Sequence, residues 1–260
     1  MSFLQQPKSL YDFRWEKRII VVFDSPCFDQ TWIKSHQKEL EEHFPYYNSL
    51  DPQNRRVFAA RVQAFISNKE FVPRGYTHVN ARMEAMIAGA AIQLTFGFRH
   101  LNFTHFSRIL VYPDNYYSSI TRKYHQGEVN LRGIIVLSWR NFVEGYSKET
   151  DGRNLGLHEM AHALRLENAI SNEEFDFIDP RILKRFDELA LEEMERIRSG
   201  EDFFRLYGAT NLQEFFAVAV ENFFERPQAF FEYNPELYTC MVQKLKQDPR
   251  QWIRTAEING

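Results

Sequence analysis

The chain has 260 residues, of which 44% are hydrophobic, and it can therefore bury a large core in one domain or in two lobes. Its formal net charge of −3 predicts no bulk electrostatic attraction to nucleic acid or to an anionic membrane. Only a local basic patch could bind such a partner. The two cysteines, Cys27 and Cys240, form no C-x-x-C motif and indicate no disulfide framework. Because the N-terminal residues contain no apolar signal-peptide segment, we expect a cytoplasmic protein.

Residues 1–105 predict a mainly helical lobe without a catalytic motif. Ile19 to Phe23 is typical of a short buried strand that ends at a turn. Apolar residues then recur at helical spacing in 29–42, from Asp51 to Ile66, and in 83–98. We expect the histidines of this lobe to be structural or surface groups rather than metal ligands.

The pattern changes after residue 105. Apolar runs at 108–112 and 133–139 predict two strands, and a polar loop at 141–154 leads into the next helix. The second strand allows two interpretations. Its continuous apolar run favours an ordinary core strand, whereas an exposed edge strand could bind an extended peptide.

The remainder of the chain predicts mainly helices. An acidic, irregular segment at 167–179 precedes a charged helix at 180–199, whose mixed charges are typical of a solvated face. A very apolar helix then ends at Glu225, and one more helix is expected after Pro235.

The segment His158-Glu159-Met160-Ala161-His162 matches the pattern H-E-x-x-H. On an α-helix, residues four apart differ by about 40° around the axis, so His158 and His162 point to one side and can bind one Zn²⁺. Glu159 then lies beside the metal, where it can take a proton from a water molecule that the metal activates. The helix is otherwise mostly apolar, and three polar side chains in a buried helix need a partner. We therefore favour a metal site over a chance match.

A catalytic zinc site generally has three protein ligands, so one more His, Asp, Glu or Cys is required. The extended metzincin pattern is excluded, because Arg165 stands at its glycine position and Asn168 at its third histidine. A deformylase-like cysteine ligand lacks supporting context at both Cys27 and Cys240.

A glutamate on the last apolar helix meets the requirement better. Glu214, Glu221 and Glu225 lie at positions i, i+7 and i+11, so they share one stripe of a nearly apolar helix. Glu214 would complete a set of two histidines and one glutamate, and Glu221 could accept a hydrogen bond from a ligand histidine. Alternatively, Glu214 only closes a capping box with Asn211. The rival ligands are Glu173, Glu174, Glu188 and Glu192.

The sequence around these residues resembles the Mlc titration factor A family of zinc peptidases. The likeness extends from about Asp29 to the end of the chain. The segment from Tyr207 to Ala217 is also similar to the catalytic domain of anthrax lethal factor. The residues that carry the family likeness most clearly are Leu137-Ser138-Trp139, Asp151-Gly152-Arg153-Asn154, His158-Glu159-Met160-Ala161-His162 and Glu214-Phe215-Phe216-Ala217-Val218.

The resemblance implies roles for two further residues. Glu214 would be the third zinc ligand rather than only a cap. Tyr207 would lie near the metal, where its phenol could donate a hydrogen bond to the oxyanion that forms on a peptide carbonyl.

Two positions depart from the family pattern. Arg165 stands where both relatives have an aspartate, and Glu167 is a candidate to replace that aspartate. Val218 stands where a carboxylate would follow the ligand by four residues, so we assign the contact with a ligand histidine to Glu221.

The motif and the resemblance together predict an α+β fold. A zincin-like catalytic domain at 106–260, with a small sheet and metal-binding helices, is expected to follow the helical lobe at 1–105. The first hypothesis for function is a zinc peptidase of the gluzincin type, with one Zn²⁺ bound by His158, His162 and Glu214. The resemblance suggests aminopeptidase-like cleavage of short peptides.

Two other hypotheses remain. The name of the family suggests a regulatory protein that binds and titrates a transcriptional repressor, with catalysis secondary or absent. The third hypothesis is a structural zinc site without turnover, and three ligands beside a glutamate argue against it.

Overall fold

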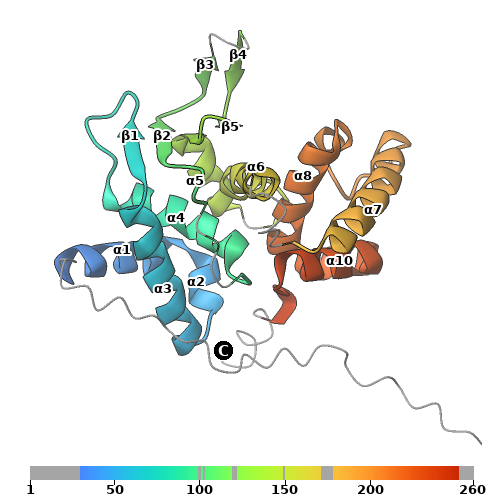
Figure 1. Cartoon of the computed structure of the whole chain (residues 1–260), viewed down its shortest axis with the longest axis horizontal. Coiled ribbons are helices and arrows are strands. Elements are labelled where there is room, and N and C mark those ends of the chain that lie inside the picture. The colour runs from blue at the N-terminus through green and yellow to red at the C-terminus, as the bar shows by residue number, and fades with distance from the viewer. Residues whose placement is uncertain are drawn as a thin grey trace, which may run out of the picture.

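The computed structural model describes residues 30–98, 101, 103–118, 122–148, 150–170 and 178–251. These residues form an α+β structure in which helices predominate over one small sheet and one short hairpin (Figure 1). The elements in chain order are α1 (Gln30–His43), α2 (Pro45–Ser49), α3 (Pro52–Ser67), β1 (Glu70–Pro73), α4 (Ala81–Thr95), β2 (Arg108–Tyr112), β3 (Tyr116–Ser118), β4 (Lys123–His125), β5 (Gly127–Asn130), β6 (Ile134–Ser138), α5 (Trp139–Ser147), α6 (Leu155–Ile170), α7 (Pro180–Arg198), the 3₁₀-helix η2 (Leu206–Ala209), α8 (Leu212–Glu225), α9 (Pro227–Tyr233) and α10 (Pro235–Leu245).

The four-stranded sheet has the strand order β1-β2-β6-β5. The strands β1, β2 and β6 are parallel, and Arg108 of β2 lies opposite both Glu70 of β1 and Ile134 of β6. The last strand, β5, runs antiparallel to β6 and forms an edge of the sheet. The strand predicted at 133–139 is therefore an internal strand, as its apolar run favours, and the edge beside it belongs to β5.

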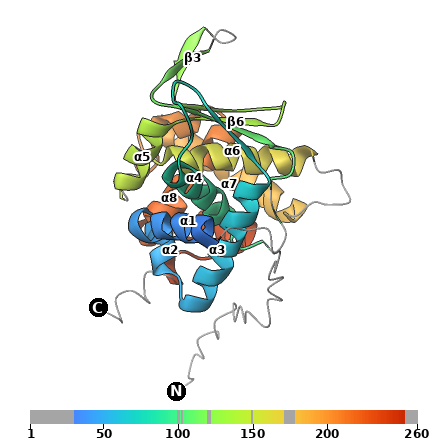
Figure 2. The same ribbon diagram turned by 90° about the vertical axis from the view of Figure 1, so that its left-hand side faces the viewer.

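The sheet lies over α4 and α6, and the remaining helices pack below and beside these two (Figures 1 and 2). Helix α4 can occupy this central place because it is rich in alanine, and Ala85, Ala88, Ala90 and Ala91 are completely buried. On the other side of α6 lies α8, which is apolar around most of its circumference and buries Phe215 and Phe216.

Polar side chains at the helix starts explain several boundaries. Asp51 accepts hydrogen bonds from two backbone amides of α3, and Asn80 caps α4 in the same way through the amide of Met83. Asp179 and Asn211 cap α7 and α8. No helix in the described part of the chain combines the length and the hydropathy that crossing a lipid bilayer requires.

The prediction of a loop at 141–154 is wrong for the first half of this segment, which belongs to helix α5. The sequence carries a helical signal here, because Trp139, Phe142 and Tyr146 stand at positions i, i+3 and i+7 and form one aromatic row. The loop prediction followed instead from the polar residues and the glycine of the segment. In that row, the rings of Trp139 and Phe142 lie 5.5 Å apart, and those of Phe142 and Tyr146 lie 5.1 Å apart. Ser138 supplies its N-cap.

Other differences concern short strands. Residues 70–73 pair with β2, so the predicted helical lobe contributes an edge strand to the sheet. Strands β3 and β4 form a hairpin that projects from the body of the molecule (Figures 1 and 2). The strand predicted at 19–23 lies outside the described residues. The division at residue 105 stays a prediction.

Candidate metal centre

Helices α6 and α8 bring three of the predicted ligands together. His158 and His162 lie one turn apart on α6, and Glu214 faces them from the first turn of α8. The Oε2 atom of Glu214 lies 3.2 Å from Nε2 of His158 and 3.4 Å from Nε2 of His162. The two Nε2 atoms are 3.1 Å apart, and all three ligand atoms lie within 4.8 Å of one another.

This donor set fits a zinc ion. The Oε2 atom of Glu214 is buried and makes no hydrogen bond among the described residues, although it lies close to both imidazoles. A buried carboxylate oxygen without a partner is unusual, and a cation between the three groups would satisfy it. Two imidazole nitrogens and one carboxylate oxygen are also the donors of many catalytic zinc sites, which keep a fourth position open.

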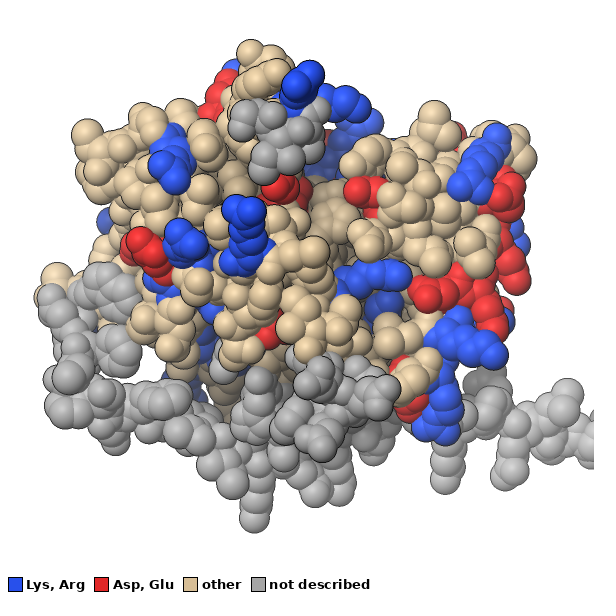
Figure 3. All heavy atoms as spheres, turned by 45° about the horizontal axis from the view of Figure 1, so that its top comes forward, with Lys and Arg blue, Asp and Glu red and all other residues tan. Residues whose placement is uncertain are grey.

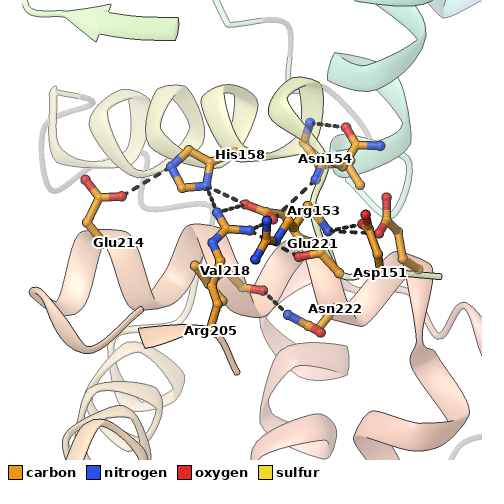
Figure 4. Close-up of polar contacts among 12 residues, drawn as sticks. Asp151, Arg153, Asn154, His158, Arg205, Glu214, Val218, Glu221 and Asn222 are labelled. Carbon is orange, nitrogen blue, oxygen red and sulfur yellow. Dashed lines mark hydrogen bonds and ion pairs between the residues drawn. The ribbon is translucent and has the colours of Figure 1, made fainter. Parts of the chain in front are cut away.

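Glu221 and Arg205 fix the orientation of His158 from behind (Figure 4). The completely buried Glu221 places Oε1 2.5 Å from Nδ1 of His158. The guanidinium of Arg205 donates to both carboxylate oxygens of Glu221, one at 2.8 Å, and lies 3.3 Å from the same Nδ1. Figure 4 shows His158 between Glu214 on one side and this ion pair on the other, which directs Nε2 toward the other ligand atoms.

The carboxylates around His158 make the site strongly favourable for a positive charge. Burial lowers the pKa of His158, but Glu214 and Glu221 outweigh burial and raise this pKa to about 10. Burial raises the pKa of Glu214, but His158 and His162 outweigh it and hold this pKa well below its ordinary range. The same field that retains a proton on the imidazole also favours a divalent cation among these groups.

Glu159 is buried between α6 and β5. Burial raises the pKa of its carboxyl above the ordinary value, which suits a proton acceptor that must also release the proton. The opposing residue on the strand is Gly127, where an added Cβ would lie only 2.5 Å from the Glu159 carboxylate. The absent side chain of Gly127 therefore makes room for Glu159.

Tyr207 comes from the 3₁₀-helix η2 and is 50% exposed. Its ring centroid lies 6.0 Å from that of His158. Burial of the phenol and the adjacent Glu214 carboxylate raise the pKa of Tyr207 to about 12, so the hydroxyl keeps its proton at neutral pH and can donate.

The cap of α8 does not depend on the side chain of Glu214. Asn211 is the N-cap of α8, and its Oδ1 accepts from the amides of Gln213 and Glu214 at 2.9 and 3.0 Å. The side chain of Glu214 is therefore not needed for this cap and faces the histidines.

The rival ligands do not join the three converging side chains. Glu188 and Glu192 are exposed on α7, and Glu188 pairs with Arg185 at 3.2 Å. Cys240 is buried, with its Sγ 3.8 Å from the carbonyl oxygen of Ile182. Three other candidates, Cys27, Glu173 and Glu174, lie outside the described residues.

The two departures from the family pattern have simple local consequences. Arg165 pairs with Asp187 at 4.0 Å, and Val218 is completely buried. Glu167 accepts hydrogen bonds from the hydroxyl of Thr104 at 2.7 Å and the amide of His105 at 3.1 Å, so it connects α6 to the loop before β2.

Two cavities meet at these residues, with volumes of about 620 and 560 Å³. Both are lined by His158, Glu159 and Tyr207, and by Gly127 and His125 from the strand side. Figure 3 shows one face of the molecule, with a hollow near its centre and interspersed acidic and basic side chains around it.

Three residues of this centre escaped prediction from the sequence. Arg205 and His125 carry no local pattern that indicates a role. Gly127 gave a usable signal, because a glycine within a strand often marks the close approach of another group.

Comparison with known proteins identifies similar sequences in one metallo-peptidase family. A model of the glucose-regulated metallo-peptidase M90 family matches residues 15–246. Mlc titration factor A of Salmonella agona is 26% identical over 236 residues, which cover 83% of this chain and 88% of that protein. The corresponding protein of Edwardsiella ictaluri is 28% identical over 221 residues, or 77% and 82% of the two chains. An uncharacterised protein of Synechocystis is 26% identical over 222 residues, or 79% and 81%.

These matches confirm the resemblance that the sequence motifs indicated. Because the family model spans nearly the whole chain, from before α1 to just past the end of α10, the chain belongs to the glucose-regulated metallo-peptidase M90 family.

Proposed function

We propose that the chain is a zinc-dependent peptidase with a zincin-like, gluzincin-type site. The observation that carries this proposal is the convergence of His158, His162 and Glu214 beside the buried carboxylate of Glu159. Membership of a metallo-peptidase family supports the general reaction. The choice of zinc rests on the donor set of two imidazoles and one carboxylate.

Each residue has a defined task in this proposal. A zinc ion at the site would lower the pKa of a water molecule and polarise the carbonyl of the substrate. Glu159 takes a proton from the attacking water and delivers it to the leaving nitrogen. Tyr207 donates a hydrogen bond to the carbonyl oxygen as negative charge develops there. Glu221, held by Arg205, orients His158.

The substrate would lie along β5. Among the described residues this strand pairs with β6 on one side only, and its Gly127 is adjacent to Glu159. An extended peptide could pair with its other side and bring a peptide bond to the candidate metal centre. The family resemblance suggests aminopeptidase-like cleavage, although the sequence indicates no pocket for a terminal amine.

A second function is supported by one observation, the name Mlc titration factor A carried by several relatives. We propose as the alternative that the chain binds and titrates a transcriptional repressor protein, with catalysis secondary or absent. A Glu159→Gln variant separates the two functions, because it would lose hydrolysis and keep repressor binding.

The test of the peptidase proposal is the metal content and activity of three purified proteins. We expect near-stoichiometric zinc in the wild type and in Glu159→Gln, and a large loss of zinc in Glu214→Ala. We expect peptide hydrolysis by the wild type and a rate about 10²–10⁴-fold lower in Glu159→Gln. Full zinc affinity in Glu214→Ala would refute the ligand assignment. Absence of metal in all three after reconstitution with zinc would leave only the binding function.

A further inference from the structure

The two cavities at the candidate metal centre extend in opposite directions along α6. The larger cavity continues toward the start of this helix, where Asn154 and Leu155 line it. The other continues along its C-terminal half, where Leu166 and Ala169 line it. His158 lines both cavities, so the cleft is open on each side of the metal ligands.

We propose that this cleft binds an oligopeptide across the metal centre and cleaves internal peptide bonds, with a preference for apolar residues on both sides of the cleaved bond. The inference rests on the proposed peptidase function and specifies its substrate class. It differs from the aminopeptidase-like mode that the resemblance suggests.

The length of the cleft sets the size of the substrate. Its lining residues on α6 run from Leu155 to Ala169, which corresponds to about 21 Å along the helix axis. An extended peptide rises about 3.3 Å per residue, so about six residues fit beside the helix. A site that accepts six residues on both sides of the catalytic groups suits an internal bond.

Exposed apolar side chains mark both arms of the cleft. Tyr124, on strand β4 of the projecting hairpin, is 73% exposed and lines the larger cavity. Leu131 is also 73% exposed and lines the smaller cavity together with Val129 and Leu166. Large apolar side chains that remain exposed at a groove are typical of sites where an apolar group of a partner is buried.

The charged side chains of the cleft do not favour a terminal amine as the anchor. An exopeptidase of that kind needs a carboxylate that is available to the α-amino group. Two of the carboxylates that line the cavities have tasks in the proposed reaction, since Glu159 moves the proton and Glu214 is a metal ligand. Each of the other four has a polar partner among the described residues. These pairs are Glu128 with the Tyr116 hydroxyl at 3.5 Å, Glu144 with Lys148 at 2.8 Å, Asp151 with the Arg153 amide at 2.9 Å, and Glu221 with Arg205 at 2.8 Å.

The test uses decapeptides with an acetylated N-terminus and an amidated C-terminus. One peptide carries Phe-Leu at its centre, and a matched peptide carries Ala-Ala. The zinc-loaded wild type is incubated with each, the products are identified by mass spectrometry, and aminoacyl p-nitroanilides are assayed in parallel. Binding to Glu159→Gln is followed by fluorescence anisotropy of labelled peptides, so that affinity is measured without turnover.

We expect cleavage of both blocked peptides at internal bonds, with kcat/KM about tenfold higher for Phe-Leu. Cleavage of the p-nitroanilides alone would overturn the inference and leave the peptidase proposal intact. In that case Glu128 would be the remaining anchor for the amine, and Glu128→Gln would reduce the activity. Inactivity toward all substrates, with full zinc content, would overturn both proposals.

Three variants test the apolar preference. Tyr124→Ala and Leu131→Ala should each lower kcat/KM for the Phe-Leu peptide about tenfold, weaken its binding, and change the Ala-Ala peptide much less. Leu191→Ala is the control, because Leu191 lies on α7, is 53% exposed and lines neither cavity, and it should leave both values unchanged. An equal effect of all three substitutions would overturn the assignment of Tyr124 and Leu131.

Discussion

The close approach of β5 to α6 predicts that Gly127→Ala inactivates the site without removing the metal. A Cβ at residue 127 would lie 2.5 Å from Cδ and Oε1 of Glu159 and 2.6 Å from its Cγ. Ordinary contact between such atoms is about 3.5 Å or more, so the carboxylate must move by about 1 Å. A displacement of this size in a catalytic group costs about 10²-fold in rate, and we expect kcat to fall by this factor.

The measurement is kcat for a peptide substrate, together with zinc content and thermal unfolding of the same preparation. Gly208→Ala is the matched control, because an added Cβ there would lie 3.5 Å from the nearest atom of Val218, which is ordinary contact. We expect this control to retain wild-type activity. A Gly127→Ala enzyme with wild-type kcat would refute the assignment of Glu159 as the proton acceptor in its observed position.

Three further substitutions have defined outcomes. Glu221→Gln weakens the support of His158, so zinc affinity measured by chelator competition should fall about 10–100-fold, and unchanged affinity would contradict that support. Tyr207→Phe should lower kcat by about 10²-fold at unchanged zinc content, and equal rates would remove the phenol from the mechanism. Burial under the rings of Phe186 and Phe216 lowers the pKa of Lys244 from 10.5 to about 7. Between pH 7 and pH 10.5 the unfolded chain therefore binds more protons than the folded chain. The free energy of unfolding rises with pH in this range by about 1.4 kcal/mol per pH unit. Lys244→Met should abolish this rise in urea unfolding at pH 7 and 9, and parallel profiles for the two proteins would refute it.

Long periodic helices were predictable from the sequence because their pattern is local. The predicted segments at 29–42, 83–98 and 180–199 agree with α1, α4 and α7 to within a few residues. The apolar strands β2 and β6 were predicted, at 108–112 and 133–139. The strands β1, β3, β4 and β5 were not, because they are very short, have no apolar run and exist only through pairing with other segments. Residues 70–73 illustrate this, since a polar residue and a proline bound a strand that β2 alone completes.

The candidate metal centre was likewise predictable only in part, where the pattern is local. The spacing of the motif places His158 and His162 on one helix face, and the stripe on α8 places Glu214 and Glu221 on one side. Neither pattern states that α6 and α8 are neighbours, which depends on packing across about 50 residues of sequence. Arg205 was missed for this reason, since its role appears only when its distance to Glu221 is known.

The candidate ligands belong to two helices, so a bound metal would join α6 and α8 as a cross-link. An ion that binds only this folded arrangement stabilises it by about 4 kcal/mol when its free concentration is a thousand times its dissociation constant. A loss of that size changes the unfolded fraction about a thousandfold, and the unfolded fraction governs degradation in cells. Zinc supply would therefore set the cellular lifetime of the chain as well as its activity.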